Sequence, residues 1–179
     1  LKRTRRKDSK MADKSVKMGD SYKKDSHMQQ TATGRAIATE VLSKRVLKYI
    51  DENLADFETT APFRIGEFGA ADGSNSVGVL TQIVETIRSR SATKPIEITC
   101  NDLPSANMTA LFEHLNPLKE KFGNLYIRAT GDSFYNQLFP DNSLDMSFSF
   151  TSVHWIQKVP CFLNATVYTS FGSEDLDPE

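Results

Sequence analysis

Residues 64–76, which read RIGEFGAADGSNS, constrain the fold more than any other stretch of the chain. A short apolar run ends at Glu67, a turn of small residues follows, and an amphipathic helix begins near Ser76. Glycine lets a ligand approach the backbone closely because no Cβ blocks it. The free N–H groups at the start of a helix can bind polar ligand atoms. The stretch therefore predicts a strand, a tight turn and a helix, with either a nucleotide site or an ordinary turn between them.

The spacing of the glycines in this turn narrows the class of ligand. Gly69 and Gly73 do not form the G-x-G-x-x-G fingerprint of dinucleotide-binding domains, which argues against a dehydrogenase. An acidic residue stands two positions before the first glycine, and the pattern G-x-A-x-G follows. This pattern suits a nucleoside ligand without a pyrophosphate, of which S-adenosylmethionine (SAM) is an example.

Strand and helix patterns alternate from this turn to the end of the patterned chain. The alternation of strands with helices predicts a parallel sheet with helices on both faces. In such sheets, ligands bind at the carboxyl ends of the strands. Residues 133–140 are expected to form a short helix or a turn. We expect helices over 34–54, from 76 to about 87 and over 104–117, and strands at 63–68, 96–100, 125–129 and 144–150.

Charge and composition exclude several classes of protein. The net charge is −1, which does not indicate nucleic acid, although residues 1–24 hold ten Lys and Arg against three Asp. We interpret residues 1–20 as a disordered basic tail, with a nuclear or nucleic-acid-binding tail as the alternative. No apolar run is long enough to span a membrane, and no secretory signal follows the basic start. Cys100 and Cys161 form no disulfide framework, so a cytoplasmic protein is expected.

Polar and aromatic residues gather where the predicted strands end. Asp102 could accept hydrogen bonds from the two hydroxyls of a ribose, or it could cap the next helix. Asn75 could bind the methionine part of SAM, or cap its own helix. Ser133 and Phe134 follow the third strand, where an adenine would lie, although Phe134 could equally belong to the core.

His154 and Trp155 follow the fourth strand, and a histidine there invites a role as a base. His27 and His114 are distant in sequence, and no Cys or carboxylate stands at ligand spacing from any histidine, so no metal site is expected. The G-x-S-x-G motif of serine hydrolases is absent.

Five blocks in register resemble the SABATH family of methyltransferases, which includes the salicylate, jasmonate, benzoate and caffeine-pathway enzymes. Each block alone is weak, but together they cover about residues 21–160. The blocks are SYKKDSHMQ at 21–29, EFGAADGSNS at 67–76, NDLP at 101–104, SFYNQLFP at 133–140 and SVHWIQKVP at 152–160.

The resemblance implies a Rossmann-like class I SAM-dependent methyltransferase fold. Residues 21–179 would be the N-terminal part of that domain, with a truncated sheet of about four parallel strands. The C-terminal strands and the α-helical cap of the family would be missing. We therefore expect the fourth strand to expose an edge, and the isolated chain to be poorly stable and inactive.

The resemblance also implies roles for individual residues. SAM would be the cofactor, and no residue would act as a catalytic base because a carboxylate acceptor is already ionised at pH 7. The substrate would be held by Gln29, His154 and Trp155. The SAM site would be lined by Ser21, Glu67, Gly69, Asn75, Asp102, Leu103, Ser133 and Phe134.

The implied function is transfer of a methyl group from SAM to a carboxylate, or to a ring nitrogen, of a small-molecule acceptor. The alternative is a catalytically inactive, truncated methyltransferase-like fragment that acts as a binding module. Asp25, Ala70, Ala71 and Thr151 depart from the usual family residues and leave the substrate open. The sequence does not fix the oligomeric state, for which a homodimer is one option.

Overall fold

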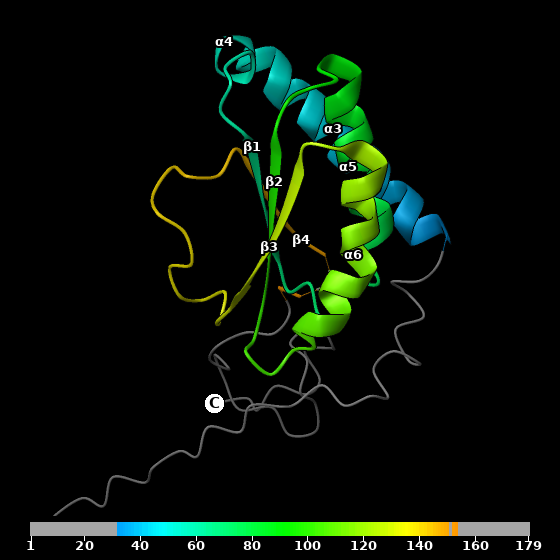
Figure 1. Ribbon diagram of the computed structural model, residues 1–179, viewed down its shortest axis with the longest axis vertical. Helices are drawn as coiled ribbons and strands as arrows, with labels where there is room; N and C mark the ends of the chain where they lie inside the picture. Colours follow the sequence, from blue (N-terminus) through cyan, green and yellow to red (C-terminus); the bar gives the residue numbers. More distant parts are fainter. Residues whose placement is uncertain (1–31, 151, 154–179) are drawn as a thin grey trace, which may run out of the picture.

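The computed structural model describes residues 32–150 and 152–153, which build a four-stranded parallel sheet in the order β3-β2-β1-β4 (Figure 1). The predicted α/β class and the parallel sheet are confirmed. The elements are α3 (Ala32–Glu52), α4 (Leu54–Phe57), β1 (Phe63–Phe68), α5 (Ser76–Arg90), β2 (Ile96–Asp102), α6 (Met108–Phe122), β3 (Leu125–Gly131) and β4 (Met146–Ser149).

The register of the sheet places apolar side chains of all four strands in one row. Ile65 of β1 pairs with Ile98 of β2 on one side and with Met146 of β4 on the other. Ile98 in turn pairs with Ile127 of β3. Branched apolar side chains pack well on a pleated surface, so this row forms the part of the hydrophobic core that the sheet contributes. Ile65 and Ile98 are fully buried.

The helices α3, α5 and α6 cover one face of the sheet (Figure 1). The prediction of helices on both faces is therefore wrong for the residues that the structure describes. The chain passes from β1 to β2 to β3 in one direction across the sheet, so both crossover helices pack on the same side. The order reverses only at β4, where the connection from β3 contains no helix.

The opposite face carries loop residues and polar side chains. Leu144 and Phe139 lie against Gly66, where a Cβ would be 2.8 Å from Leu144 Cδ1. Farther along this face, Arg128 of β3 forms an ion pair with Glu97 of β2 at 3.2 Å. Residues 133–140 form turns rather than a helix, which settles the open choice between the two.

The bounds predicted for the helix after β2 were wrong at both ends. α6 begins at Met108 rather than Pro104, because the Asn107 side chain accepts a hydrogen bond from Ala110 N at 3.1 Å and caps the helix there. Pro117 lies inside α6 and does not end it. A proline removes one helical hydrogen bond, but buried Leu115 and Leu118 hold this turn against the core.

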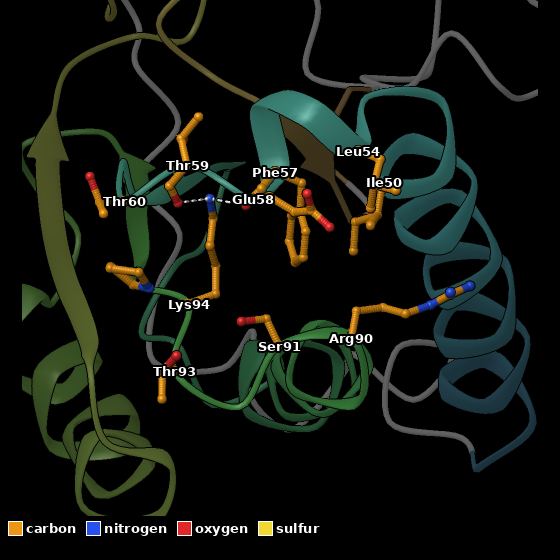
Figure 2. Close-up of a pocket in the computed structure, with 11 residues that line it drawn as sticks. Ile50, Leu54, Phe57, Glu58, Thr59, Thr60, Arg90, Ser91, Thr93 and Lys94 are labelled. Atoms are coloured by element: carbon orange, nitrogen blue, oxygen red, sulfur yellow. Dashed lines mark hydrogen bonds between the residues drawn. The ribbon is translucent and has the colours of Figure 1, made fainter.

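A cavity of about 590 Å³ lies at the amino end of the strands, between α3, α4 and the turn before β2 (Figure 2). The buried Lys94 side chain crosses this region, and its Nζ donates to the carbonyls of Phe57 and Thr59. Arg90 pairs with Asp51 at 3.1 Å. Lys94 thus ties the end of α4 and the residues after it to the turn before β2, while Arg90 joins α5 to α3. The predicted site lies at the other end of the strands.

Candidate functional site

The glycine turn after β1 folds tightly against the end of β2. Gly69 and Gly73 have φ values of 80° and 75°, in the left-handed region that favours glycine. The N–H groups of Gly69 and Ala70 both donate to Asn101 O, at 2.8 and 2.9 Å. A Cβ at Gly69 would lie 2.1 Å from Ser152 Oγ. The turn therefore requires a glycine at position 69 for both its conformation and its packing.

Asp102 stands at the end of β2 with its carboxylate directed at this turn. Its Oδ2 accepts from Ala71 N at 2.6 Å, and its Oδ1 accepts from Leu103 N at 2.7 Å. The alternative role as a helix cap is excluded, because Asn107 caps α6. A carboxylate offers about four acceptor positions, so two remain for donors outside the chain.

This arrangement fits SAM, the cofactor that the sequence implies. The two hydroxyls of a ribose are a matched pair of donors for the remaining acceptor positions of Asp102. The Asp102 side chain is half-buried, and the neighbouring Leu103 is exposed over 43% of its surface. An acidic acceptor beside an exposed apolar side chain is suited to the polar and apolar parts of a nucleoside.

The loop after β3 is tied to the same edge. Asp132 N donates to Asp102 O at 3.0 Å, and the Asn101 side chain donates to Asp132 O at 2.8 Å. Ser133 N donates to Asp132 Oδ1 at 2.7 Å. Ser133 and Phe134 are half-buried here, so the structure brings them to the same edge as Gly69 and Asp102.

Asn101 is the residue at this edge to which sequence reasoning gave no role. It is fully buried, and it joins the glycine turn through its carbonyl and the loop after β3 through its amide. The sequence did contain a signal for this role. Successive residues of a strand point to opposite faces of the sheet, so Asn101 points to the face opposite Asp102 at the same edge. Ser152 was also missed as a contact of the turn, where its Oγ donates to Gly69 O at 3.1 Å.

Glu67 lies beneath the turn rather than on its surface. Only 3% of its surface is exposed. Ser76 Oγ donates to its Oε1 at 2.5 Å, and Cys100 Sγ donates to its Oε2 at 3.5 Å. Burial raises the pKa of the Glu67 carboxyl to about 7, while the two hydrogen bonds act in the opposite direction. Direct contact of Glu67 with SAM stays a prediction that this geometry does not favour.

Asn75 precedes α5 and faces the same end of the sheet. It occupies the cap position of the helix, but its side chain makes no capping hydrogen bond. The alternative role of the Asn75 side chain, as a cap of α5, is therefore not found. Its binding of the methionine part of SAM stays a prediction.

Four predicted site residues lie outside the described residues, which are Ser21, Gln29, His154 and Trp155. Their roles stay predictions, as do the basic tail and the domain bounds. Within 32–150 and 152–153, no three His, Cys, Asp or Glu side chains are grouped as metal ligands would be. In the same part of the chain, no helix has both the length and the apolar character that crossing a membrane requires.

Comparison with known proteins identifies relatives over most of the chain. A loganic acid O-methyltransferase of Catharanthus roseus is 31% identical over 153 residues, which are 81% of this chain and 40% of the relative. A jasmonate O-methyltransferase of Arabidopsis thaliana is 28% identical over 162 residues, which are 79% and 40% of the two chains. The chain thus spans about 40% of the length of the curated relatives that it matches.

Solved structures agree with this result. A structure described as loganic acid methyltransferase with SAH has a TM-score of 0.67 and 28% identity, and the match covers 80% of this chain and 41% of that one. The DszA carbon methyltransferase has a TM-score of 0.52 at 17% identity, covering 74% and 32%, and shows the fold alone.

The sequence also matches a family profile described as SAM dependent carboxyl methyltransferase, over residues 9–172. The match includes the glycine turn, Asp102 and the loop after β3, which the structure brings together at one edge of the sheet. The chain therefore belongs to the SAM-dependent carboxyl methyltransferase family, the SABATH family that its sequence blocks resemble.

Proposed function

We propose that this protein is a SAM-dependent methyltransferase that transfers a methyl group to the carboxylate of a small molecule. The observation that carries the proposal is the Asp102 carboxylate, fixed by two backbone N–H groups at the end of β2 in a chain of this family. The relatives named for loganic acid and jasmonate support an organic acid as the acceptor. A cytoplasmic location is part of the same proposal.

The cofactor side of the site would be assembled from the three loops described above. When bound, SAM supplies a methyl group on a positively charged sulfur. Asp102 accepts hydrogen bonds from the ribose hydroxyls. Leu103, Ser133 and Phe134 would line the part of the site that takes the adenine. Gly69 would let the cofactor approach the backbone of the turn, Asn75 would bind the methionine part, and Ser21 would line the site.

The acceptor side would hold the substrate without a catalytic base. A carboxylate is ionised at pH 7, so no proton has to be removed before it attacks the methyl carbon. The task of the protein is to place the oxygen in line with the methyl carbon and sulfur, in a site with little water. Gln29 and the indole N–H of Trp155 donate to the carboxylate, and His154 lines the pocket.

Methyl transfer from labelled SAM tests this function directly. The whole protein, rather than residues 1–179 alone, is incubated with a panel of organic acids that includes loganic acid, jasmonic acid and salicylic acid, and separately with a purine. We expect label in a product that mild base hydrolyses to methanol, because a carboxyl methyl ester is base-labile. Label that survives base treatment contradicts carboxyl methylation, and base-stable label on the purine indicates a ring nitrogen as acceptor. No transfer to any acid of the panel or to a purine, with SAM bound, favours the binding module.

Replacement of Gln29 or Trp155 should separate acceptor binding from cofactor binding. We expect Gln29→Ala and Trp155→Phe each to reduce methyl transfer by roughly tenfold or more, because a misplaced acceptor loses the in-line geometry. SAM affinity should not change, since the cofactor contacts lie on other residues. Steady-state kinetics and calorimetric titration measure the two effects. Unchanged turnover in Gln29→Ala, with only the melting temperature altered in Trp155→Phe, would remove both from the acceptor site.

A further inference from the structure

Glu67 connects the three elements that hold the glycine turn. It lies on β1, two residues before Gly69, and its carboxyl accepts from Ser76 at the first position of α5 and from Cys100 of β2. The turn begins just after Glu67 on β1 and ends at Ser76, the first residue of α5. The hydrogen bond from Ser76 to the Glu67 carboxyl therefore joins the two ends of the turn. An ionised carboxyl accepts hydrogen bonds more strongly than a neutral one. The charge on Glu67 therefore affects how firmly the turn is held.

The surroundings of Glu67 disfavour its charge. Burial is the largest effect and raises its pKa to about 7, and the nearby Asp102 carboxylate acts in the same direction. The Cys100 thiol is buried with it, and burial raises the pKa of that thiol too. On α6, His114 Nδ1 lies 2.8 Å from Asp72 O in the turn itself. From β4, the register partner is the uncharged Phe148.

The charge of a bound ligand would alter the equilibrium between the neutral and the ionised form of Glu67. A positive charge placed near a buried carboxyl favours its ionised form. SAM carries a sulfonium, whereas S-adenosylhomocysteine (SAH) has a neutral sulfur and is otherwise the same apart from the methyl group. Among the described residues, the groups that shift the pKa of Glu67 include no Lys or Arg side chain. A bound sulfonium above the turn would therefore be a new positive charge for Glu67.

We propose that Glu67 is a proton-coupled positioning residue, which releases its proton when the cationic cofactor binds above the glycine turn and then holds Ser76 more firmly. The inference rests on the proposed function, because it takes SAM as the ligand of this edge. The sign follows from proton linkage. Below about pH 7 the free protein carries the proton and must lose it on binding, so SAM affinity increases as pH rises and levels off above pH 7.

Titration of the wild-type protein and Glu67→Gln with SAM and with SAH, at several pH values, tests the inference. We expect wild-type affinity for SAM to increase about fivefold or more between about pH 6 and about pH 8. Glu67→Gln cannot release this proton and should lack that increase. Affinity for SAH should increase less, since its sulfur carries no charge. Protons that titrate elsewhere on the protein or the ligand contribute equally to wild type and variant, so the difference between the two isolates Glu67.

A second variant and a measurement without ligand keep the test independent of one substitution. Ser76→Ala removes a hydrogen bond that favours the ionised carboxyl, so the pH at which SAM affinity levels off should move upward. Without ligand, the raised pKa means that stability is lost as pH rises from about 4.5 through about 7. Glu67→Gln should therefore melt at a higher temperature than wild type above pH 7.

Two results would overturn the inference, and they differ in what they leave standing. If wild type and Glu67→Gln bind SAM with the same pH dependence, the proton coupling is wrong and the SAM site remains. If the wild-type protein binds no SAM at any pH, the proposed function and the inference fall together.

Discussion

Asp102→Ala is expected to weaken SAM binding by about one to two orders of magnitude. A hydrogen bond to a charged group contributes about 1.5–3 kcal/mol, and about 1.4 kcal/mol corresponds to a tenfold change in affinity. The substitution removes the acceptor of both ribose hydroxyls in the proposed site. Calorimetric titration of the protein with SAM measures the loss. Because Asp102 also accepts from Ala71 N, a thermal melt must accompany the titration.

Asp141→Ala provides a charge-matched control for this prediction. Asp141 is exposed and accepts a hydrogen bond from Gln137 Nε2 at 2.9 Å, within the loop between β3 and β4. Its removal changes the net charge by the same amount, and SAM affinity should be retained. Equal affinities of wild type and a cooperatively folding Asp102→Ala would remove Asp102 from the site.

Gly69→Ala is expected to lower the free energy of unfolding by about 2–5 kcal/mol. A side chain in the left-handed region costs about 1–2 kcal/mol, and overpacking costs about 1–3 kcal/mol. At Gly69 the new Cβ would meet Ser152 Oγ at 2.1 Å and Ser152 Cβ at 2.4 Å. These atoms belong to a short side chain that holds Gly69 O, so the turn or the segment after β4 must move. Denaturant unfolding measures the change.

Gly78→Ala is the matched control, since the same methyl group is added in the helix that follows. A Cβ at Gly78 meets nothing within 4 Å, and the residue is exposed on α5. Alanine there should stabilise the protein by about 0.5–1 kcal/mol, because glycine is a poor helix former. If Gly69→Ala is as stable as wild type, the turn is not packed as described.

The central strand and the turn were predictable because local patterns decide them. β1 has the predicted bounds, Phe63–Phe68, since a strand buried at the centre of a sheet reads as a short apolar run before glycine. The helix that follows begins at Ser76 as expected. The parallel direction of the strands followed from the alternation of strands and helices. Asp102 could be placed at the carboxyl edge of the sheet, together with the glycine turn, because the carboxyl ends of parallel strands meet at one edge.

Other features depend on packing that no local pattern records. The face on which α6 lies follows from the order of the strands, which the alternation alone does not give. Pro117 was expected to end α6, but the helix continues to Phe122 because Leu115 and Leu118 pack into the core on either side of the proline. The partners of Glu67 were likewise not predicted. Glu67 alternates with Phe63 and Ile65 and lies on the buried face of β1, where it accepts from Ser76 and Cys100. Its contact with SAM stays a prediction.

Hydrogen–deuterium exchange with and without SAM tests most directly whether the carboxyl edge of the sheet holds the cofactor. We predict slower exchange of the amides in residues 69–76, 102–103 and 133–134 when SAM is present. The amides of residues 57–60 and 93–94, which line the cavity at the amino end of the strands, should exchange at the same rate in both states (Figure 2). Slower exchange confined to that cavity, with no change in the glycine turn at saturating SAM, would contradict the site.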